Sequence, residues 1–199
     1  MRVGILCECS GAVRDAFLRR GHDAVSCDLK PTRAPGPHIV GDCLEQDWAG
    51  YELLIMHPPC TYLASSGLHW NLRRPARVAL TDEALGFVRR MMALPVPCWA
   101  LENPIGCIST KIRKPDQIIQ PWMFGHGETK ATCLWLKGLP GLRPTDVVDG
   151  REPRIWRMGP GPDRAEARSV TYAGVAEAMA DQWTDLSAGT LFAGLEENR

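Results

Sequence analysis

Residues 2–29 of this chain, RVGILCECSGAVRDAFLRRGHDAVSCDL, decide the fold. Their apolar pattern predicts a strand over Arg2–Cys9, a helix over Ala12–Arg20 that ends at Gly21, and a second strand over Asp23–Leu29. A strand, a helix and a strand in such a short stretch form a βαβ unit. Because a βαβ unit joins parallel strands, we expect an α/β protein with a mostly parallel sheet and helices on both faces.

The rest of the chain continues the alternation. After a Pro-rich loop over 31–37, we expect strands at His38–Asp42, Leu53–Met56, Trp99–Glu102 and Cys133–Leu136, and helices at Thr81–Leu94, with Thr81 as its N-cap, and at Gly174–Gln182. A chain of 199 residues with 45% hydrophobic content fits one domain, which we expect over residues 1–186. Residues 187–199 are weakly patterned, so we expect a mobile tail there.

The composition argues against several classes of protein. No apolar stretch approaches the ~20 residues of a membrane span, and the N-terminus has no signal-peptide layout, so we expect a soluble, cytoplasmic protein. The eight cysteines form no C-x-x-C pair, which favours reduced thiols over disulfides. A zinc cluster of Cys7, Cys9, Cys27 and Cys43 is the alternative, but this spacing lacks ligand regularity and we expect no metal.

The formal net charge is zero, so no overall field draws this chain to nucleic acid. Any such partner must meet a local patch. Basic residues do cluster, at Arg73, Arg74 and Arg77, at Arg89 and Arg90, and over residues 111–114. Each cluster is either a solvated surface or a phosphate-binding site, and charge alone does not distinguish the two.

A second stretch, YELLIMHPPCTYLASSG over residues 51–67, places a thiol where a buried strand ends. The apolar run Leu53–Met56 is typical of a central parallel strand, and ligands collect beyond the carboxyl ends of such strands. Most cysteines are small core residues. However, Pro58 and Pro59 end the strand and stiffen the backbone before Cys60, which favours a site position for its thiol.

Two other strand ends carry residues suited to a nucleotide. The first turn, Glu8-Cys9-Ser10-Gly11, offers amides at a helix N-terminus. Asp28 ends the second strand at a distance from this turn that suits a ribose diol, and Asp42 ends the third. Alternatively, Asp28 caps a loop and Asp42 makes a turn with Gly41. A single glycine supports a pyrophosphate poorly, so an adenosine ligand without phosphates fits better.

The segment Leu101-Glu102-Asn103-Pro104-Ile105-Gly106 places an acid at the end of a strand that we expect beside the strand leading to Cys60. Alone, Glu102 is as well explained by a helix cap or by an ion pair with Lys111 or Arg113. Beside a thiol, Glu102 is also suited to acid–base catalysis. A thiolate that adds to a conjugated heterocycle needs an acid to neutralise the charge that develops.

Taken together, these segments resemble those of a small, phage-type DNA cytosine-5 methyltransferase. Pro59-Cys60 with the trailing Ser65-Ser66-Gly67 resembles the nucleophile loop of that family, and Glu102-Asn103 with Gly106 resembles its Glu-Asn-Val block. Thr171-Tyr172-Ala173-Gly174, followed by Ala178-Met179-Ala180, resembles its closing segment beside the cofactor. The blocks cover most of the chain and follow in the family's order.

The resemblance implies a Rossmann-like methyltransferase fold, S-adenosylmethionine as cofactor and DNA as substrate. In this chemistry the target base leaves the stack, and Cys60 adds to carbon 6 of cytosine. Glu102 protonates or hydrogen-bonds the ring nitrogen and the amino group, and carbon 5 takes the methyl group. The expected catalytic residues are Cys60, Glu102, Asn103 and Lys130. The expected cofactor contacts are Glu8, Cys9, Ser10, Gly11, Asp28, Leu29, Asp42, Cys43 and Pro58, and the expected DNA contacts are Ser65, Ser66, Arg73, Arg74, Arg77 and Arg113.

The chain departs from the family in three places. Its first loop has less glycine and lacks an aromatic residue, and Phe124-Gly125 followed by Lys130 and Thr132 stands where the family has a Tyr-Gly and an Arg-x-Arg pair. Only residues 138–168 occupy the place of the family's long target-recognition region, so we expect low or short sequence specificity. We also expect a cationic neighbour, namely Arg73, Arg74 or Arg113, to lower the pKa of Cys60.

Three alternatives remain open. An amino-methyltransferase uses an Asp/Asn-Pro-Pro-aromatic turn that is close to His57-Pro58-Pro59-Cys60, but residue 60 would then be an aromatic ring that stacks on the base. A nucleic-acid-binding module could keep the fold without the cofactor. A variant enzyme could transfer a carboxymethyl group from a carboxylated S-adenosylmethionine, which requires a basic residue such as Lys130 near the transferred carbon.

Overall fold

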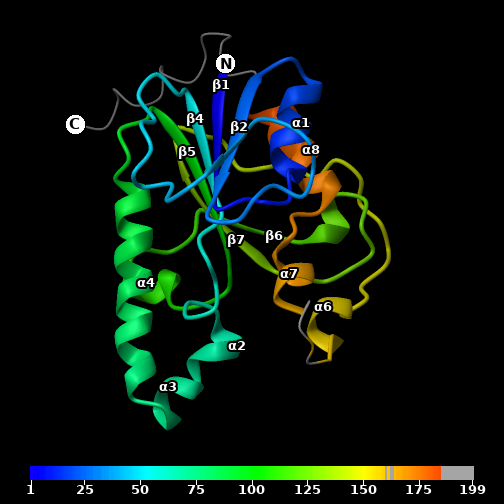
Figure 1. Cartoon of the computed structure of the whole chain (residues 1–199). Helices are drawn as coiled ribbons and strands as arrows, with labels where there is room; N and C mark the ends of the chain where they lie inside the picture. The colour runs from blue at the N-terminus through cyan, green and yellow to red at the C-terminus, as the bar shows by residue number, and fades with distance from the viewer. Residues whose placement is uncertain (160, 162–163, 185–199) are drawn as a thin grey trace, which may run out of the picture.

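The computed structural model describes residues 1–159, 161 and 164–184, so the predicted tail over 187–199 lies outside the described residues. A seven-stranded sheet in the order β3-β2-β1-β4-β5-β7-β6 forms the centre (Figure 1). Its strands are β1 (Arg2–Leu6), β2 (Asp23–Asp28), β3 (His38–Val40), β4 (Leu53–Met56), β5 (Cys98–Pro104), β6 (Gln117–Ile119) and β7 (Thr132–Lys137).

The first five strands of the chain, β1 to β5, run parallel, while β7 is antiparallel to both of its neighbours, β5 and β6. Strands β1, β4 and β5 lie in the middle. Their apolar side chains are buried from both sides, which explains the continuous apolar runs of a parallel sheet. The predicted fold class, a Rossmann-like α/β domain with a mostly parallel sheet, is confirmed.

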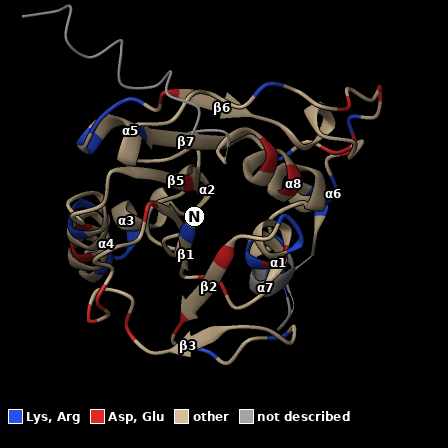
Figure 2. Ribbon diagram, turned by 90° about the horizontal axis from the view of Figure 1, so that it is seen from above, with Lys and Arg blue, Asp and Glu red and all other residues tan. Residues whose placement is uncertain are grey.

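Helices cover both faces of the sheet. Helices α1 (Ala12–Arg19) and α8 (Ala173–Gln182) pack on one face, and α4 (Ala76–Met92) packs on the other, as the view from above shows (Figure 2). Strand β4 contributes side chains to the cores on both faces of the sheet. Leu53 and Ile55 belong to the core under α1 and α8, whereas Leu54 and Met56 belong to the core under α4. This double burial fixes the register of the strand that leads to Cys60.

Several predicted boundaries were wrong for local reasons. Strand β1 ends at Leu6, because Cys7 takes a left-handed backbone conformation with φ 59°. Helix α4 begins at Ala76, so Thr81 is not an N-cap; its hydroxyl donates to the carbonyl of Arg77 inside the helix. Strand β5 continues beyond Glu102 to Pro104. Strand β6 was not predicted, since its three residues show too little pattern.

Two helical projections extend beyond the carboxyl ends of the parallel strands (Figure 1). One contains α2 (Ser65–Leu68), α3 (Trp70–Arg73) and the start of α4, and the other contains α6 (Arg154–Arg157) and α7 (Arg164–Ser169). Helix α5 (Ile108–Lys111) and a 3-10 turn at Pro121–Met123 complete the elements. Within the described part of the chain, no helix is long and apolar enough to cross a membrane, and no three potential metal ligands come together.

Candidate active site

Cys60 lies just beyond β4, with its side chain exposed to solvent. The chain turns sharply there, because the carbonyl of Cys60 accepts the backbone N–H groups of Leu63 (3.0 Å) and Ala64 (2.9 Å). Ala64 then bridges to Gly106, which follows β5. The turn therefore presents the thiol at the edge of the sheet instead of burying it, in contrast to Cys27, Cys107 and Cys133.

Glu102 lies on β5, which pairs with β4 in parallel register. The Nδ1–H of His57 donates to its Oε2 at 3.3 Å, and both side chains are largely buried, with 10% and 14% exposed. The next residue, Asn103, is buried and donates from Nδ2 to the carbonyl of Pro58 at 2.7 Å. These two bonds tie the end of β5 to the segment that leads to Cys60.

The protonation states of the thiol and the carboxyl group differ from the expectation. Although the side chain of Cys60 reaches solvent, the protein atoms packed around its sulfur desolvate it, and this and the negative charge of Glu102 raise the pKa of Cys60; the charges of Arg168 and Lys130 oppose the shift. The expected lowering by Arg73, Arg74 or Arg113 is therefore wrong.

For Glu102, burial alone would raise the pKa. The hydrogen bond from His57 and the charge of Lys130, aided by the Thr132 hydroxyl, outweigh the burial and lower it. At neutral pH the site consequently holds a thiol beside a carboxylate.

Lys130 stands beside Glu102, although the two residues come from different parts of the chain. Its Nζ donates to the carbonyl of Val170 at 3.3 Å and lies 5.7 Å from the centre of the Tyr172 ring. Glu102 and Lys130 line a small recess together with Ile119, Gln120, Pro121, Thr132, Thr171, Tyr172 and Val175. This recess joins β5, the chain before β7 and the start of α8 in one site.

The segment before α8 closes against the loop after the 3-10 turn. A Cβ atom on Gly174 would lie 1.9 Å from the carbonyl oxygen of Phe124, so only glycine permits this contact. The N–H of Gly174 donates to Nε2 of His126 at 3.0 Å, and the hydroxyl of Tyr172 donates to Glu128 at 2.5 Å. These contacts hold Thr171–Gly174 against the loop after the 3-10 turn.

In the first turn, the side chain of Glu8 has a structural partner. Glu8 is buried, and its carboxylate accepts the Ser10 hydroxyl (3.0 Å) and the backbone N–H groups of Val13 (2.8 Å) and Arg14 (3.3 Å). It therefore caps the positive end of α1. The expected direct contact between Glu8 and a cofactor is not supported, whereas Gly11, with φ 79°, gives the turn its shape.

The other predicted cofactor residues are distributed unevenly around this edge of the sheet. Asp28 accepts the N–H of Lys30, and Asp42 accepts that of Leu44, both at 2.9 Å. Asp28 thus caps its loop as the alternative prediction had it, whereas Asp42 makes its local turn with Leu44 and not with Gly41. A carboxylate has further acceptor capacity, which leaves both free to bind a ligand as well. Cys43 is buried, with its sulfur 3.8 Å from that of Cys7, while the carbonyl of Cys9 accepts the N–H of Arg33 at 2.8 Å.

Leu29 and Pro58 complete the predicted cofactor set and differ in exposure. Leu29 is 75% exposed, whereas Pro58 is buried beside Asn103. A recess of about 440 Å³ lies nearby, beside the first residues of α1 and α8. It is lined by Ala12, Asp15, Arg19, Arg154, Ile155, Val170, Thr171, Tyr172 and Ala173, and so by neither Asp28 nor Asp42.

The predicted DNA-binding residues also separate into groups. Ser65 and Ser66 are exposed on α2, and Arg73 and Arg74 are exposed on and just after α3. Arg77 instead holds the loop after Cys60, because its guanidinium donates to the carbonyl of Thr61 at 2.6 Å and lies 4.5 Å from the centre of the Tyr62 ring.

Arg113 is bound to Asp116 and to the carbonyl of Leu136, which assigns it a structural role at β7. Its expected contact with DNA is not supported.

The sequence reasoning missed His57 as a site residue. The residue was visible in the motif His57-Pro58-Pro59-Cys60, but only the fold brings its ring to Glu102. Among the described residues, Nε2 of His57 and Oδ1 of Asn103 are buried without a hydrogen-bond partner. Buried polar atoms normally find a partner, so these two atoms are suited to a polar ligand.

Comparison with known proteins adds little to the assignment of a family. No protein-family model and no curated protein matches the sequence. Among the solved structures that match is a candidate DNA modification methyltransferase encoded within a prophage of E. coli, with 13% identity and a TM-score of 0.46. The match covers 74% of this chain, which spans only about half (52%) of that protein. A similarity of this degree does not place the chain in a family.

Proposed function

We propose that this protein transfers a methyl group from S-adenosylmethionine to carbon 5 of cytosine in DNA, through a covalent bond between Cys60 and carbon 6 of the base. One observation carries the proposal. The exposed thiol of Cys60, just beyond β4, lies close enough to the buried carboxylate of Glu102 on the adjacent strand β5 for the charge of that carboxylate to raise the pKa of the thiol. A nucleophile next to an acid–base group is the arrangement that covalent addition to a heterocycle needs.

The cofactor fits the carboxyl edge of the sheet in chemical terms. Asp28 and Asp42 offer carboxylate oxygens for hydroxyl groups, and Ser10 and Gly11 form the turn at the start of α1. The recess beside Thr171–Ala173 has a volume within the usual range for small-molecule sites and reaches the start of α1 at Ala12, but neither aspartate lines it. S-adenosylmethionine, when bound, supplies an electrophilic methyl group to carbon 5.

The residues of this chain manage the protons. As sulfur bonds to carbon 6, the Cys60 thiol gives up its proton, and the ring nitrogen N3 gains one through the Glu102 carboxylate, so charge does not accumulate on the base. His57 and Lys130 hold Glu102 ionised and ready to accept the proton. In the last step a solvent base takes the carbon-5 proton, the electrons of that bond form the double bond between carbons 5 and 6, and sulfur leaves carbon 6 as a thiolate. The N3 proton then returns through Glu102 to the sulfur, which restores the thiol.

Mass analysis of nucleosides tests the proposal. Purified protein is incubated with S-adenosylmethionine and DNA, and the DNA is digested to nucleosides. We expect 5-methylcytosine from the native protein and none from Cys60→Ser, which should fold normally because the side chain is exposed. Methylation at an amino group of cytosine or adenine, or unchanged activity of Cys60→Ser, would contradict the covalent scheme.

A further inference from the structure

The projection that follows Cys60 has an unusual distribution of charge. We define the basic arm as residues 61–80, which include α2, α3 and the start of α4. It contains Arg73, Arg74 and Arg77 but no Asp or Glu, in a chain whose formal net charge is zero. The positive charge of this surface therefore comes from the local arrangement of residues after Cys60 and not from the overall composition of the chain.

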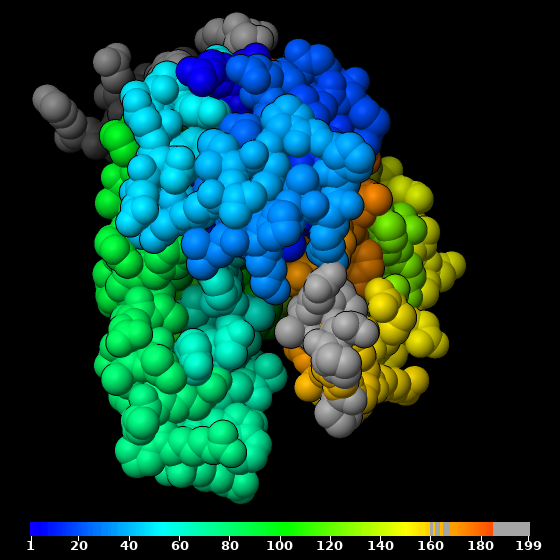
Figure 3. Space-filling view, viewed as in Figure 1, coloured from blue at the N-terminus to red at the C-terminus, as the bar shows by residue number. Residues whose placement is uncertain are grey.

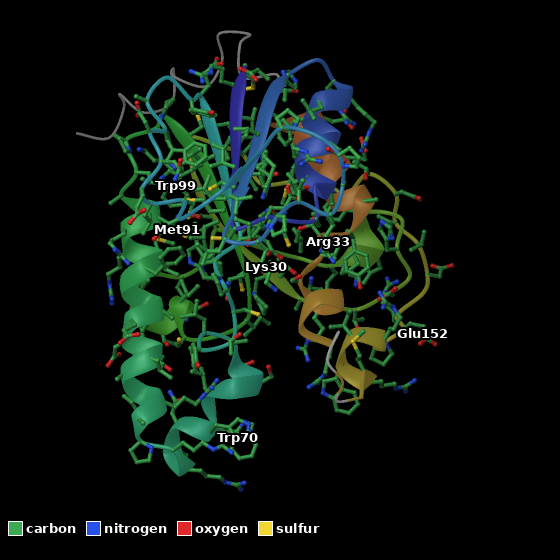
Figure 4. The ribbon with its side chains drawn as sticks, in the orientation of Figure 1. Lys30, Arg33, Trp70, Met91, Trp99 and Glu152 are labelled. Carbon is green, nitrogen blue, oxygen red and sulfur yellow. The ribbon has the colours of Figure 1, made fainter. Side chains whose placement is uncertain are left out.

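Trp70 lies on this arm, far from the sheet (Figure 4). Its side chain is 38% exposed although the residue is large and aromatic. The guanidinium carbons of Arg73 and Arg74 lie 5.5 Å and 5.2 Å from the centre of its ring, and the His69 ring centre lies 4.9 Å away. An aromatic ring surrounded by guanidinium groups is suited to a ligand with both flat rings and negative charges.

The basic arm borders a hollow on the surface. The space-filling view shows it between the arm and the projection that carries α6 (Figure 3). Helix α6 exposes another aromatic residue, Trp156, at 79%, with Arg157 beside it and Arg154 paired with Glu128. Cys60 lies between β4 and the arm in the sequence, and its side chain is exposed to solvent.

We propose that the basic arm binds an unpaired DNA strand, with Trp70 stacking on a base near the target and Arg73 and Arg74 contacting phosphates. This inference rests on the proposed function and names the form of its substrate. Stacking on a tryptophan ring requires a base with an open face, which a base inside a duplex lacks. A protein partner is less well matched, because an interface with exposed apolar residues alone would not need an acid-free segment.

Equilibrium binding tests the inference without any turnover. Fluorescence anisotropy would compare a labelled single-stranded oligonucleotide with the same sequence as a duplex, in the absence of S-adenosylmethionine. We expect the single strand to bind at least several-fold more tightly. Trp70→Ala should weaken its binding by about ten-fold, given the usual contribution of one stacked base, while Trp70→Phe should keep most of the affinity.

A neighbour on the same helix provides the control. Leu72 is 90% exposed, so Leu72→Ala should fold as the native protein does and leave binding unchanged. If Trp70→Ala and Leu72→Ala weaken binding equally, the surface is a general apolar contact and the inference fails. It also fails if the duplex binds more tightly, or if Trp70→Ala has no effect. Arg73→Gln with Arg74→Gln should reduce the dependence of affinity on salt, and an unchanged salt dependence would overturn the phosphate contacts.

The two proposals can fail separately. Binding of the single strand that depends on Trp70, in a protein that methylates no cytosine, would support the arm and refute the proposed chemistry. Methylation of cytosine by a protein whose Trp70→Ala variant binds the single strand as tightly as before would support the proposed chemistry and refute the role of the arm.

Discussion

At the scale of single residues, Cys60 rests as a thiol and Glu102 as a carboxylate, so the proposed addition must begin with loss of the thiol proton. Cys60 keeps its proton because its pKa is raised, first by partial burial and then by the charge of Glu102. Glu102 has lost its proton because its pKa is lowered despite burial. A thiol is less reactive than a thiolate, so Cys60 should react slowly with alkylating reagents at neutral pH.

This reciprocal effect predicts how the reactivity of Cys60 changes with pH. Alkylation by iodoacetamide, followed at the Cys60 peptide by mass spectrometry, should have its midpoint above the ordinary thiol value of about 8.5. Glu102→Gln removes the negative charge and should lower the midpoint, whereas Lys130→Met removes a positive charge and should raise it. A midpoint that moves with neither variant would show that the three side chains do not interact.

His57 should be a positioning residue for Glu102. In His57→Ala the carboxylate loses its hydrogen bond while it stays buried, so the pKa of Glu102 should rise. Because the ionised form is needed, the decline of kcat/KM on the acid side should move to higher pH. The rate should fall roughly ten- to hundred-fold, the range for a hydrogen bond to a charged group. His22→Ala, before β2, should leave the pH profile unchanged, and an unshifted profile in His57→Ala would refute the role.

At the scale of elements, the site depends on a close contact between two loops. Gly106, just after β5, touches the turn after Cys60: its Cβ would lie 1.9 Å from the carbonyl oxygen of Leu63. Two backbone hydrogen bonds cross the same contact, from Ser65 to Ile105 and from Cys107 to Leu63, both at 2.9 Å. The absence of a side chain at residue 106 therefore lets the thiol approach the strand that carries Glu102.

A pair of glycine substitutions tests this contact. Gly106→Ala should destabilise the fold by about 1–3 kcal/mol, because the added methyl group meets backbone atoms that cannot rotate away, and activity should fall with it. Gly86→Ala is the matched control: it lies inside α4 with open space around its Cβ and should stabilise the protein by about 0.5–1 kcal/mol. Thermal unfolding measures both, and equal stability of the two variants would contradict the proposed contact.

The sequence was informative for elements with strong periodicity and for residues next to them. Leu53–Met56 and the βαβ unit were predicted because buried strands have continuous apolar runs, and Cys60 and Glu102 followed from their positions at strand ends. The contact of His57 with Glu102 could not be predicted, since it depends on pairing between β4 and β5. Likewise, the role of Glu8 as a cap of α1 depends on the backbone of the first turn.

At the scale of the whole molecule, the sheet gathers distant parts of the chain at one edge. His57, Glu102, Lys130 and Tyr172 come from four separate segments and meet around one recess or its immediate border. Helix α8 holds the last of these segments, because Glu177 and Asp181 form ion pairs with Arg19 at the end of α1 and Arg20 just after it. The candidate site therefore depends on the complete layered fold, although its side chains lie near one end of the sheet.

Covalent trapping tests the central chemistry most directly. The protein would be incubated with S-adenosylmethionine and DNA that contains 5-fluorocytosine, in which fluorine cannot leave carbon 5 as a proton does. We expect a complex that survives denaturation, and peptide mass spectrometry should locate the modified base on the sulfur of Cys60. An active protein that forms no such complex, or one attached through another residue, would contradict the account.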